Sequence, residues 1–223
     1  MHKIKKLIIY GAGETAEICA DYFNRDSEYE VVAFCADSEF VQQNSINSIP
    51  VIAFEEIELK YPPSECDAFA AASSVKLNSV RKKMYDALKL KGYKCATYIS
   101  SHSFVWHNVE IGENVFIFEN NVIQYKVKIG NNVILWSGNH IGHQSIIRDN
   151  CFISSHVVVS GFCEIGENVF LGVNSSVNDN IKIAKDCATG NGAIIIKNTV
   201  DGMLYVGNPA KAIYSSHEAF GIK

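Results

Sequence analysis

Four of the seven histidines lie in the segment 105–195, where the sequence repeats regularly. Imidazole has an unperturbed pKa of about 6.5, so a histidine is the side chain best suited to accept a proton at neutral pH. Which histidine can act, and beside which neighbours, depends on how the repeat places each one. His143 and His107 hold equivalent positions in the repeat, whereas His140 and His156 do not.

The repeat is an aliphatic residue at every sixth position, without insertion, and only Thr189 departs from it. An α-helix would need a spacing of about 3.6 and a flat strand a spacing of about 2, so neither explains a strict six. A repeat this short predicts a solenoid of hexapeptides, a parallel β-helix. The repeating positions are Val105, Ile111, Ile117, Ile123, Ile129, Leu135, Ile141, Ile147, Ile153, Val159, Ile165, Leu171, Val177, Ile183, Thr189 and Ile195.

A second period of eighteen residues is superimposed on the first, because Ile111-Gly-Glu-Asn is followed at that interval by Ile129-Gly-Asn-Asn. Three hexapeptides therefore form one coil of a triangular prism, and glycine and asparagine, which tolerate positive φ, turn its corner. Slim residues two positions before the aliphatic ones are predicted to fill the interior. They are Val109, Val115, Val127, Val133, Ser145, Cys151, Val157, Cys163, Val169, Ser175, Cys187 and Ala193.

This coil fixes the relative places of the histidines. His107 and His143 share a column two coils apart, about 10 Å at roughly 4.8 Å per coil, with Tyr125 between them. His107 lies in the first coil and is predicted to be a surface residue. His140 directly precedes a core position and is predicted to form structural hydrogen bonds. His156 lies on another corner of the triangle, where a solvent-facing imidazole is the alternative to a role in a site.

Residues 1–98 have a different pattern, in which short apolar strands alternate with amphipathic helices. Strands are predicted at 7–10, 31–35, 68–72 and 94–99, a short element at 50–52, and helices at about 14–23 and 77–90. This alternation, with a glycine turn after the first strand, predicts a parallel α/β sheet.

The turn after the first strand could bind an anion. Gly11 and Gly13 open a helix whose first N–H groups and positive end suit a phosphate, with Glu14 and Thr15 in its first turn. Asp37 follows the second strand, where a carboxylate would meet a ribose or a base. The alternative is a tight turn without a ligand, because the third glycine of a dinucleotide-binding pattern is absent.

Composition disfavours several classes of function. The net charge of −4 predicts no polyanion-binding surface and so no nucleic-acid partner. No apolar run approaches the roughly 18 residues that span a bilayer, and the apolar stretch near the start is too short for a signal peptide. The seven cysteines form no CxxC pair, and Cys19, Cys151, Cys163 and Cys187 are expected to be buried free thiols in a reducing cytoplasm. No metal site is expected.

Three segments resemble the NeuD/PglD-type sugar acyltransferases: residues 9–13, 135–143 and 205–211, which read IYGAG, LWSGNHIGH and YVGNPAK. The resemblance covers nearly the whole chain and is greatest to the N-acetyltransferases of nucleotide-linked amino sugars, such as the GDP-perosamine enzyme. It implies a Rossmann-like domain at 1–98 that holds the nucleotide sugar, followed at 99–223 by a left-handed β-helix acyltransferase domain with a C-terminal cap. It also implies a homotrimer, acetyl-CoA as acyl donor, and a role in making bacterial surface glycans such as O-antigen.

The resemblance also assigns the catalytic base. In that family the catalytic histidine lies four residues before an aliphatic position of the repeat, and His143 matches it ahead of Ile147. An acid that steadies the imidazole follows in PglD-like members, but Gln144 stands here, which leaves the orienting group open. Since a corner of a neighbouring copy faces the first in a trimer, His156 is predicted to contact acetyl-CoA or the sugar substrate.

Acetyl-CoA is predicted to lie along the later coils, where glycines leave room for pantetheine and two lysines meet the phosphates. These residues are Gly142, Gly161, Gly172, Gly190, Gly192, Lys197 and Lys211. The alternative for each lysine is a solvated charge. A backbone N–H of Gly142, Gly161 or Gly172 is expected to stabilise the oxyanion formed during acyl transfer.

Three other functions remain open at this point. An O-acetyltransferase of sialic acid or a related sugar would use the same fold and base. A zinc-dependent carbonic anhydrase on the same solenoid would need three converging histidines, and Arg148 occupies one of the required positions. A catalytically silent protein that binds nucleotide sugars is the third alternative, because Gln144 departs from the family pattern.

Overall fold

The computed structural model describes residues 3–222, which form two compact units. The first comprises the chain through Ser73 together with Arg81–Tyr98, and the second comprises Ser74–Val80 and the chain from Ile99 onward. The strict six-residue repeat lies wholly within the second unit. The units are therefore described separately.

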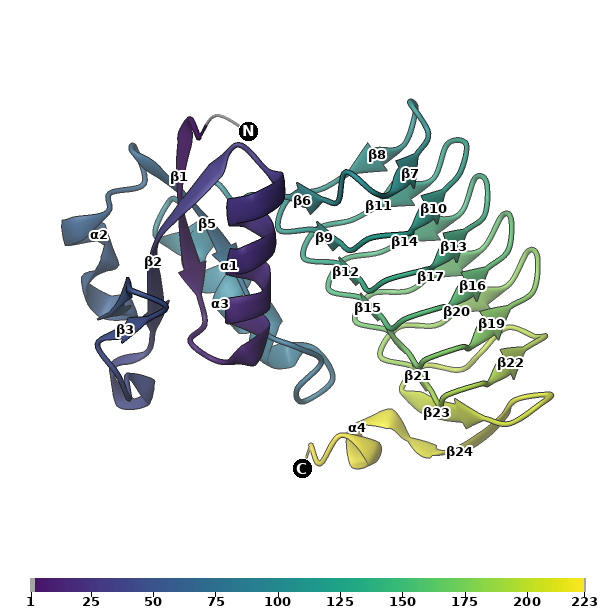
Figure 1. Ribbon diagram of the computed structural model, residues 1–223. Coiled ribbons are helices and arrows are strands. Elements are labelled where there is room, and N and C mark those ends of the chain that lie inside the picture. The colour runs from purple at the N-terminus through teal and green to yellow at the C-terminus, as the bar shows by residue number, and fades with distance from the viewer. Residues whose placement is uncertain (1–2, 223) are drawn as a thin grey trace. The chain divides into compact units, whose positions relative to one another are not determined.

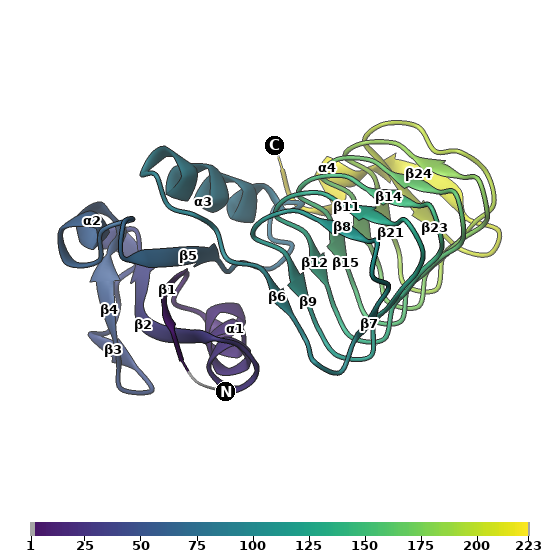
Figure 2. The ribbon, with the colours of Figure 1, turned by 90° about the horizontal axis from the view of Figure 1, so that it is seen from above.

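The first unit is an α/β sheet with strand order β3-β4-β2-β1-β5. Its elements are β1 (Lys5–Tyr10), α1 (Glu14–Asp26), β2 (Tyr29–Ala36), β3 (Ser45–Ile46), β4 (Ile49–Ala53), α2 (Ile57–Lys60), β5 (Cys66–Ala70) and α3 (Ser79–Leu90), with 3₁₀ turns at Ser38–Phe40 and Phe54–Glu56. β1 pairs in parallel with both β2 and β5, which confirms the predicted parallel sheet. Figure 2 shows α1 and α3 on opposite faces of this sheet.

Helix α1 covers its face of the sheet with a stripe of small and aromatic side chains. Ala16, Cys19, Ala20 and Phe23 are buried, and their spacing of three and four places them on one side of a 3.6-residue helix. The strand predicted at 94–99 forms only in part, as one isolated parallel bridge from Cys95 to Ala68 beside β5 and as the short strand β6 (Tyr98–Ile99), which belongs to a different sheet.

The second unit is a left-handed parallel β-helix, and the strands within its coils are two residues long. We name its sheets PB1, PB2 and PB3. PB1 holds β6 (Tyr98–Ile99), β9 (Phe116–Ile117), β12 (Ile134–Leu135), β15 (Phe152–Ile153), β18 (Phe170–Leu171) and β21 (Ala188–Thr189). PB2 holds β7 (Phe104–Val105), β10 (Val122–Ile123), β13 (His140–Ile141), β16 (Val158–Val159), β19 (Ser176–Val177) and β22 (Ile194–Ile195). PB3 holds β8 (Glu110–Ile111), β11 (Lys128–Ile129), β14 (Ile146–Ile147), β17 (Glu164–Ile165) and β20 (Lys182–Ile183).

The register of the coils follows the sequence repeat. Each predicted position of the six-residue repeat is the second residue of a strand, and it pairs with its counterpart one coil away, as Ile123 does with Ile141. Figure 1 shows the strands of each sheet stacked in this order. The slim positions point into the same core, where Val133, Cys151 and Val169 are fully buried. All seven cysteines are free and buried, among them the four for which this was predicted.

Three corners join the sheets, and most of their turns use one residue with positive φ. We name them T1 (PB1 to PB2), T2 (PB2 to PB3) and T3 (PB3 to PB1). At T3 the turning residues include Asn114, Asn132 and Asn150, whose side-chain amides bond from coil to coil at 2.8 Å. Asparagine recurs at this corner for two reasons. It tolerates positive φ, and its buried side-chain amide is satisfied by the equivalent amide in the next coil.

Two further segments complete the solenoid. After the last coil, β23 (Met203–Val206) pairs in parallel with β21, and β24 (Lys211–Ser215) pairs antiparallel with β23. Helix α4 (Ser216–Ala219) follows, and the ring of Phe220 packs on Phe170 at 5.3 Å between centroids. These elements cover the terminal strand edge, as the predicted cap would.

The segment Ser74–Val80 packs with the solenoid, although it lies within the predicted N-terminal domain of residues 1–98. Asn78 is fully buried, and its amide Nδ2 donates to the carbonyls of Asn168 at 3.5 Å and Val169 at 3.4 Å. The residues predicted as the start of a helix at 77 therefore form a turn, and α3 begins at Ser79.

Two outer faces of the prism differ in chemistry. Outward side chains of PB3 are charged except for Ile146, with Glu110 bonded to Lys128 at 3.0 Å and Glu164 flanked by Arg148 at 2.7 Å. Arg148 lowers the pKa of the Glu164 carboxyl by a direct hydrogen bond. Outward side chains of PB2 are instead mostly apolar and exposed, Phe104, Val122 and Val158 among them. Across residues 3–222, none of the helices has the length and apolar character of a membrane span.

Candidate active site

His143 lies on corner T2, between β13 and β14, with its side chain exposed. Its backbone N–H donates to Oε1 of Gln124 in the coil below at 3.1 Å. The next residue, Gln144, turns the corner with φ of +58° and donates its N–H to the carbonyl of Tyr125 at 2.8 Å. The backbone that carries the imidazole is therefore held to the preceding coil on both sides of its Cα.

The imidazole itself is oriented by packing. A Cβ atom on Gly161, one coil above, would lie 2.6 Å from Cε1 of His143 and 2.8 Å from Nε2, so the ring occupies the space that a side chain would need. Phe162 presents its ring at 84° to the imidazole with centroids 5.0 Å apart. Within residues 3–222, no carboxylate is hydrogen-bonded to the imidazole. Gly161 and Phe162 thus orient the ring by packing, where the sequence left the orienting group open.

The column through His143 contains one residue from each coil: His107, Tyr125, His143, Gly161, Asp179 and Lys197. Tyr125 is 45% exposed below the histidine, and the carboxylate of Asp179 accepts the Gly161 N–H at 2.9 Å above it. His107 is exposed and its ring packs against Trp106 at 5.3 Å, in agreement with its predicted place on the surface.

The three glycines expected to offer an oxyanion donor all have bonded amides. Gly142 donates to the carbonyl of Val159 at 2.7 Å, Gly161 to Asp179 as above, and Gly172 to Oγ1 of Thr189 at 2.9 Å. Their N–H groups are therefore taken up inside the solenoid. The sequence alone did not predict that these amides are bonded, because two of the acceptors are side chains from a neighbouring coil.

His156 lies on corner T1, where it is the turning residue with φ of +58°. Its ring covers Gly138 in the coil below, since a Cβ there would lie 2.5 Å from Nδ1 of His156. T1 and T2 border the two edges of the same sheet, PB2, so His143 and His156 flank one face of the prism from opposite sides. His140 lies on that face itself, paired between Val122 and Val158.

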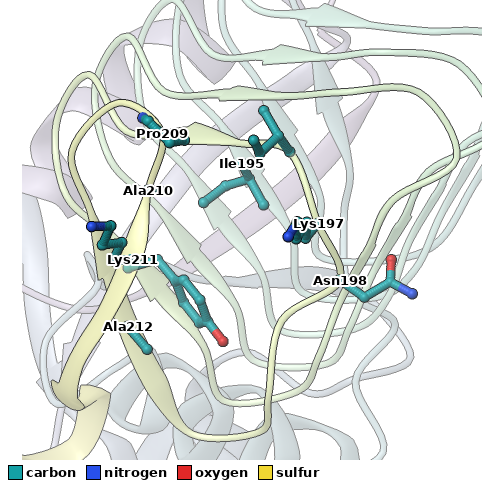
Figure 3. A pocket seen from close by; sticks show the side chains of 9 residues that line it. Ile195, Lys197, Asn198, Pro209, Ala210, Lys211 and Ala212 are labelled. Atoms are coloured by element: carbon teal, nitrogen blue, oxygen red, sulfur yellow. The ribbon is translucent and has the colours of Figure 1, made fainter.

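The remaining residues expected to bind acetyl-CoA divide between the same two corners and the last coil. Gly172, Gly190 and Gly192 lie on T1, whereas Gly142, Gly161 and Lys197 lie on T2. A pocket of about 390 Å³ at the end of the solenoid is lined by both Lys197 and Lys211, which lie on opposite sides of it in Figure 3. Its lining is otherwise apolar or neutral, with Ile195, Ile196, Asn198, Tyr205, Pro209, Ala210 and Ala212. Two cations without a carboxylate in the lining favour an anion.

In the first unit, Gly11 and Gly13 serve different purposes. Gly11 has φ of +133°, and a Cβ there would meet the carbonyl of Ala71 at 2.5 Å, so the fold itself requires this glycine. Gly13 caps α1, and a Cβ there would meet nothing within 4 Å. Glu14 and Thr15 follow in the first turn. Open space beside exposed helix N–H groups suits a phosphate, although the acidic Glu14 opposes it.

Asp37 follows β2 at the same edge of the sheet. Its carboxylate accepts a hydrogen bond from the hydroxyl of Tyr10, whose ring stacks on Phe54 with centroids 4.1 Å apart. Burial, together with this carboxylate, raises the pKa of the Tyr10 hydroxyl, which keeps it a neutral donor. Tyr10 and Phe54 were not singled out from sequence, because nothing in the local pattern distinguishes them from ordinary core residues.

The donor groups for a metal ion are scattered. Over the part of the chain that the structure describes, no group of three or more histidine, cysteine, aspartate or glutamate side chains gathers in one place. The imidazole of His143 is exposed beside the apolar outer face of PB2. It can accept a proton from a bound nucleophile.

Two family models match the chain, in the order of its two units. Residues 6–88 match the PglD N-terminal domain, and residues 126–161 match the bacterial transferase hexapeptide of six repeats. The first match covers the glycine turn and Asp37, and the second covers His143 and His156.

Solved structures share the fold over almost the whole chain. The acetyltransferase domain of PglB from Neisseria gonorrhoeae FA1090 is 24% identical with a TM-score of 0.84, covering 94% of this chain and 100% of that one. A histidine-to-asparagine variant of perosamine N-acetyltransferase from Caulobacter crescentus, in complex with CoA and GDP-perosamine, is 22% identical with a TM-score of 0.84, covering 94% and 97%. WeeI from Acinetobacter baumannii AYE is 20% identical with a TM-score of 0.79, covering 94% and 100%.

At these identities the structural likeness establishes a common fold, while the two family models identify the kind of domain in each half. A PglD-type N-terminal domain followed by the hexapeptide repeats of bacterial transferases is the combination predicted from the sequence, and in both halves the chain is similar to the NeuD/PglD-type sugar acyltransferases.

Proposed function

We propose that the protein is an acetyl-CoA-dependent N-acetyltransferase that acts on the amino group of a nucleotide-linked amino sugar, with His143 as general base. The observation that carries this proposal is the exposed imidazole, held over Gly161 at the edge of an apolar sheet face. The substrate class is supported by a structure of similar fold, which was solved in complex with CoA and GDP-perosamine. Surface-glycan synthesis would consume such a product.

The active form is a homotrimer that packs through PB2. The charges of PB3 favour solvent, whereas the exposed apolar side chains of PB2 favour a second copy of this chain. In a three-fold assembly each contact is heterologous, so one edge of a face meets the opposite edge of the next copy. Corner T2 of one copy then faces corner T1 of its neighbour.

This packing brings His143 toward His156 of another copy at nearly the same level. A coil of eighteen residues rises about 4.8 Å, and His156 follows His143 by thirteen residues, so it lies about 3.5 Å further along the axis. A three-fold axis parallel to the solenoid keeps that difference between copies. The glycines of T1 and T2 line the two walls of one cleft, which gives pantetheine a channel toward His143.

The rest of each substrate has a place of its own. Lys197 and Lys211 in the terminal pocket hold phosphate groups of CoA. The N-terminal unit holds the nucleotide, with Gly13 beside the phosphates and Asp37 beside the ribose or base. Free, buried thiols throughout the chain fit a reducing compartment, and we place the reaction in the cytoplasm.

The reaction is a direct acyl transfer. The amine nitrogen attacks the thioester carbon, and the carbonyl π electrons move onto oxygen as His143 takes a proton from the amine. The C–S bond then breaks, the sulfur leaves with its electron pair, and the imidazolium returns the proton to the thiolate. The products are an amide and free CoA, and a base of this kind contributes about 10²–10⁴ in rate.

A substrate panel tests the proposal. UDP-, GDP- and dTDP-linked amino sugars are each incubated with acetyl-CoA, and free thiol is measured over time. Turnover of at least one amino sugar, lost in His143→Asn, is the expected result. Turnover of hydroxy sugars such as sialic acid alone would replace the proposal with an O-acetyltransferase, and no turnover with any acceptor would refute it.

A further inference from the structure

Phe162 is an unusual residue for the corner that it turns. It lies on T2 in the coil above His143, with φ of +56°. A bulky side chain is disfavoured in this left-handed region, where asparagine and glycine are tolerated best. Among residues 99–222, the other positions with positive φ hold asparagine, aspartate, lysine, glutamine, histidine or glycine. The Phe162 side chain is 50% exposed, so it does not fill the core. An aromatic residue in a strained and exposed position suggests a role beyond the fold.

The ring of Phe162 lies beside the imidazole of His143, with centroids 5.0 Å apart and planes at 84°. A Cβ on Gly161 would lie 2.6 Å from Cε1, 2.8 Å from Nε2 and 3.1 Å from Nδ1 of that imidazole. Three adjacent ring atoms at such similar distances place Gly161 over one face of the imidazole. Phe162 comes from the same turn as Gly161, on the same side, so it meets the imidazole at the edge and turns its own face toward it.

A phenyl face attracts positive charge. It carries the negative part of the aromatic quadrupole and stabilises a cation that lies within about 6 Å of the ring centre. The imidazole becomes such a cation when it takes the proton of the amine. A carboxylate next to the base would serve the same purpose, but residue 144 is glutamine. Because the neutral imidazole gains much less from the phenyl face, the contact strengthens as the proton is transferred.

The other titratable groups near the imidazole come from neighbouring coils. The Asp179 carboxylate above it accepts the Gly161 N–H at 2.9 Å. Tyr125 lies below it, with Nζ of Lys126 5.1 Å from the centre of the phenol ring. In the proposed trimer, His156 of another copy approaches from the side. Within residues 3–222, none of these groups is hydrogen-bonded to the imidazole, whereas the phenyl ring is in contact with it.

We propose that the face of the Phe162 ring stabilises the imidazolium form of His143 during acyl transfer, in the role that a carboxylate would otherwise fill. This inference rests on the proposed function. As the amine nitrogen bonds to the thioester carbon, its proton moves to the imidazole and a positive charge forms beside the phenyl face. The charge disappears when the C–S bond breaks and the thiolate takes the proton. Phe162 acts through His143 and is therefore a positioning residue.

Fluorinated phenylalanines at position 162 test this role, because each fluorine weakens the negative face with little change in ring shape. From one to five fluorines, kcat should fall progressively, by about threefold to thirtyfold in total, with KM for both substrates unchanged. The acidic limb of the pH–rate profile should move to lower pH in the same order, because the protonated base loses stabilisation. The same series at Phe170, which stacks on Phe152 in PB1, is the control and should leave kcat within about twofold.

Ordinary substitutions separate the aromatic face from packing. Phe162→Leu keeps an apolar side chain without that face and should lower kcat by about threefold or more, whereas Phe162→Tyr keeps the face and should stay within about twofold. Phe162→Asn suits the left-handed backbone, so it should raise Tm while it lowers kcat. A leucine variant with full kcat would assign Phe162 to packing alone and overturn the proposal.

A measurement without substrates separates this inference from the proposed function. The His143 imidazole, followed by proton NMR, should titrate at progressively lower pH as fluorines are added. If the unchanged protein turns over an amino sugar but fluorination leaves both kcat and this titration unchanged, the Phe162 assignment is wrong and the proposed function stands. A titration that moves to higher pH would mean that Phe162 presents its edge, and would also overturn the assignment. The expected titration in a protein without turnover on any acceptor would refute the proposed function instead.

Discussion

The imidazole of His143 and the backbone of Gly161 are in direct contact across adjacent coils, and the contact leaves no room for a side chain at position 161. Gly161 is not in the left-handed region, so alanine there suits the backbone and displaces only the imidazole. Gly161, one coil above His143, therefore fixes the position of the imidazole by direct contact.

Gly161→Ala should lower kcat by about tenfold or more, because a base moved by an ångström loses much of its effect. Kinetic assays should show little change in KM for either substrate. In a His143→Ala background the same substitution should have no further effect on kcat, since the group it displaces is gone. Additive losses in the double variant would show that Gly161 acts by another route.

His143→Asn should reduce kcat by at least about 10²-fold while calorimetry still detects binding of both substrates. The acidic limb of the pH–rate profile should disappear with the imidazole. His156→Asn should be milder and should act mainly on KM. A normal kcat in His143→Asn combined with a large loss in His156→Asn would transfer the role of base to His156.

Gly13→Val should raise KM for the nucleotide sugar and leave acetyl-CoA affinity intact, because its side chain would fill open space beside the first turn of α1. Thermal denaturation should show little loss of stability. Gly11→Ala is the contrasting variant, since its Cβ would meet the Ala71 carbonyl at 2.5 Å and the fold should be destabilised. Weakened acetyl-CoA binding in Gly13→Val would mean that the two sites are exchanged.

Val158→Glu should convert the proposed trimer to monomers and abolish turnover, because it would bury a charge in the proposed PB2 contact. Sedimentation velocity measures the first effect and thiol release the second. Ile146→Glu is the matched control, since it holds the same strand position on PB3 beside Lys128 and should remain trimeric and active. A monomer at micromolar concentration in the unchanged protein would contradict the assembly itself.

Lys197→Ala and Lys211→Ala should each raise KM for acetyl-CoA by roughly tenfold, in line with about 1.5 kcal/mol for a charged hydrogen bond. Assays with acetyl-dephospho-CoA, which lacks the 3′-phosphate, show whether either lysine binds that phosphate. If either lysine binds the 3′-phosphate, its alanine variant should lose the preference for acetyl-CoA over the dephospho form. Unchanged KM values in both variants would leave these lysines as solvated charges.

The solenoid could be predicted because its signal is local and repeated. Each strand of the coils contributes one core position at a fixed interval, so Ile123, Ile141 and Val159 fall into register from sequence alone. The same register placed His143 and His156 on different corners. Because residue 144 is glutamine, the sequence also indicated that no acid next to His143 orients its imidazole.

The details of the site could not be predicted, because they depend on contacts between coils. The N–H of Gly161, for example, is already bonded to the carboxylate of Asp179 in the next coil. The strand predicted at 94–99 formed only in part for a similar reason, since its β propensity was realised as one isolated bridge and as β6, the first strand of PB1. A local sequence pattern predicts whether a segment forms a strand or a helix, but not which other segment it pairs with.

The short segment Ser74–Val80 limits how far the two halves can be treated as exchangeable modules. The chain leaves the first unit at Ser73, contributes the buried Asn78 to the solenoid, and returns to the first unit at Arg81 before leaving again at Tyr98. A solenoid expressed from residue 99 would leave the carbonyls of Asn168 and Val169 without the Asn78 amide. Any recombination that grafts a different N-terminal unit onto these coils must therefore carry this segment with the solenoid.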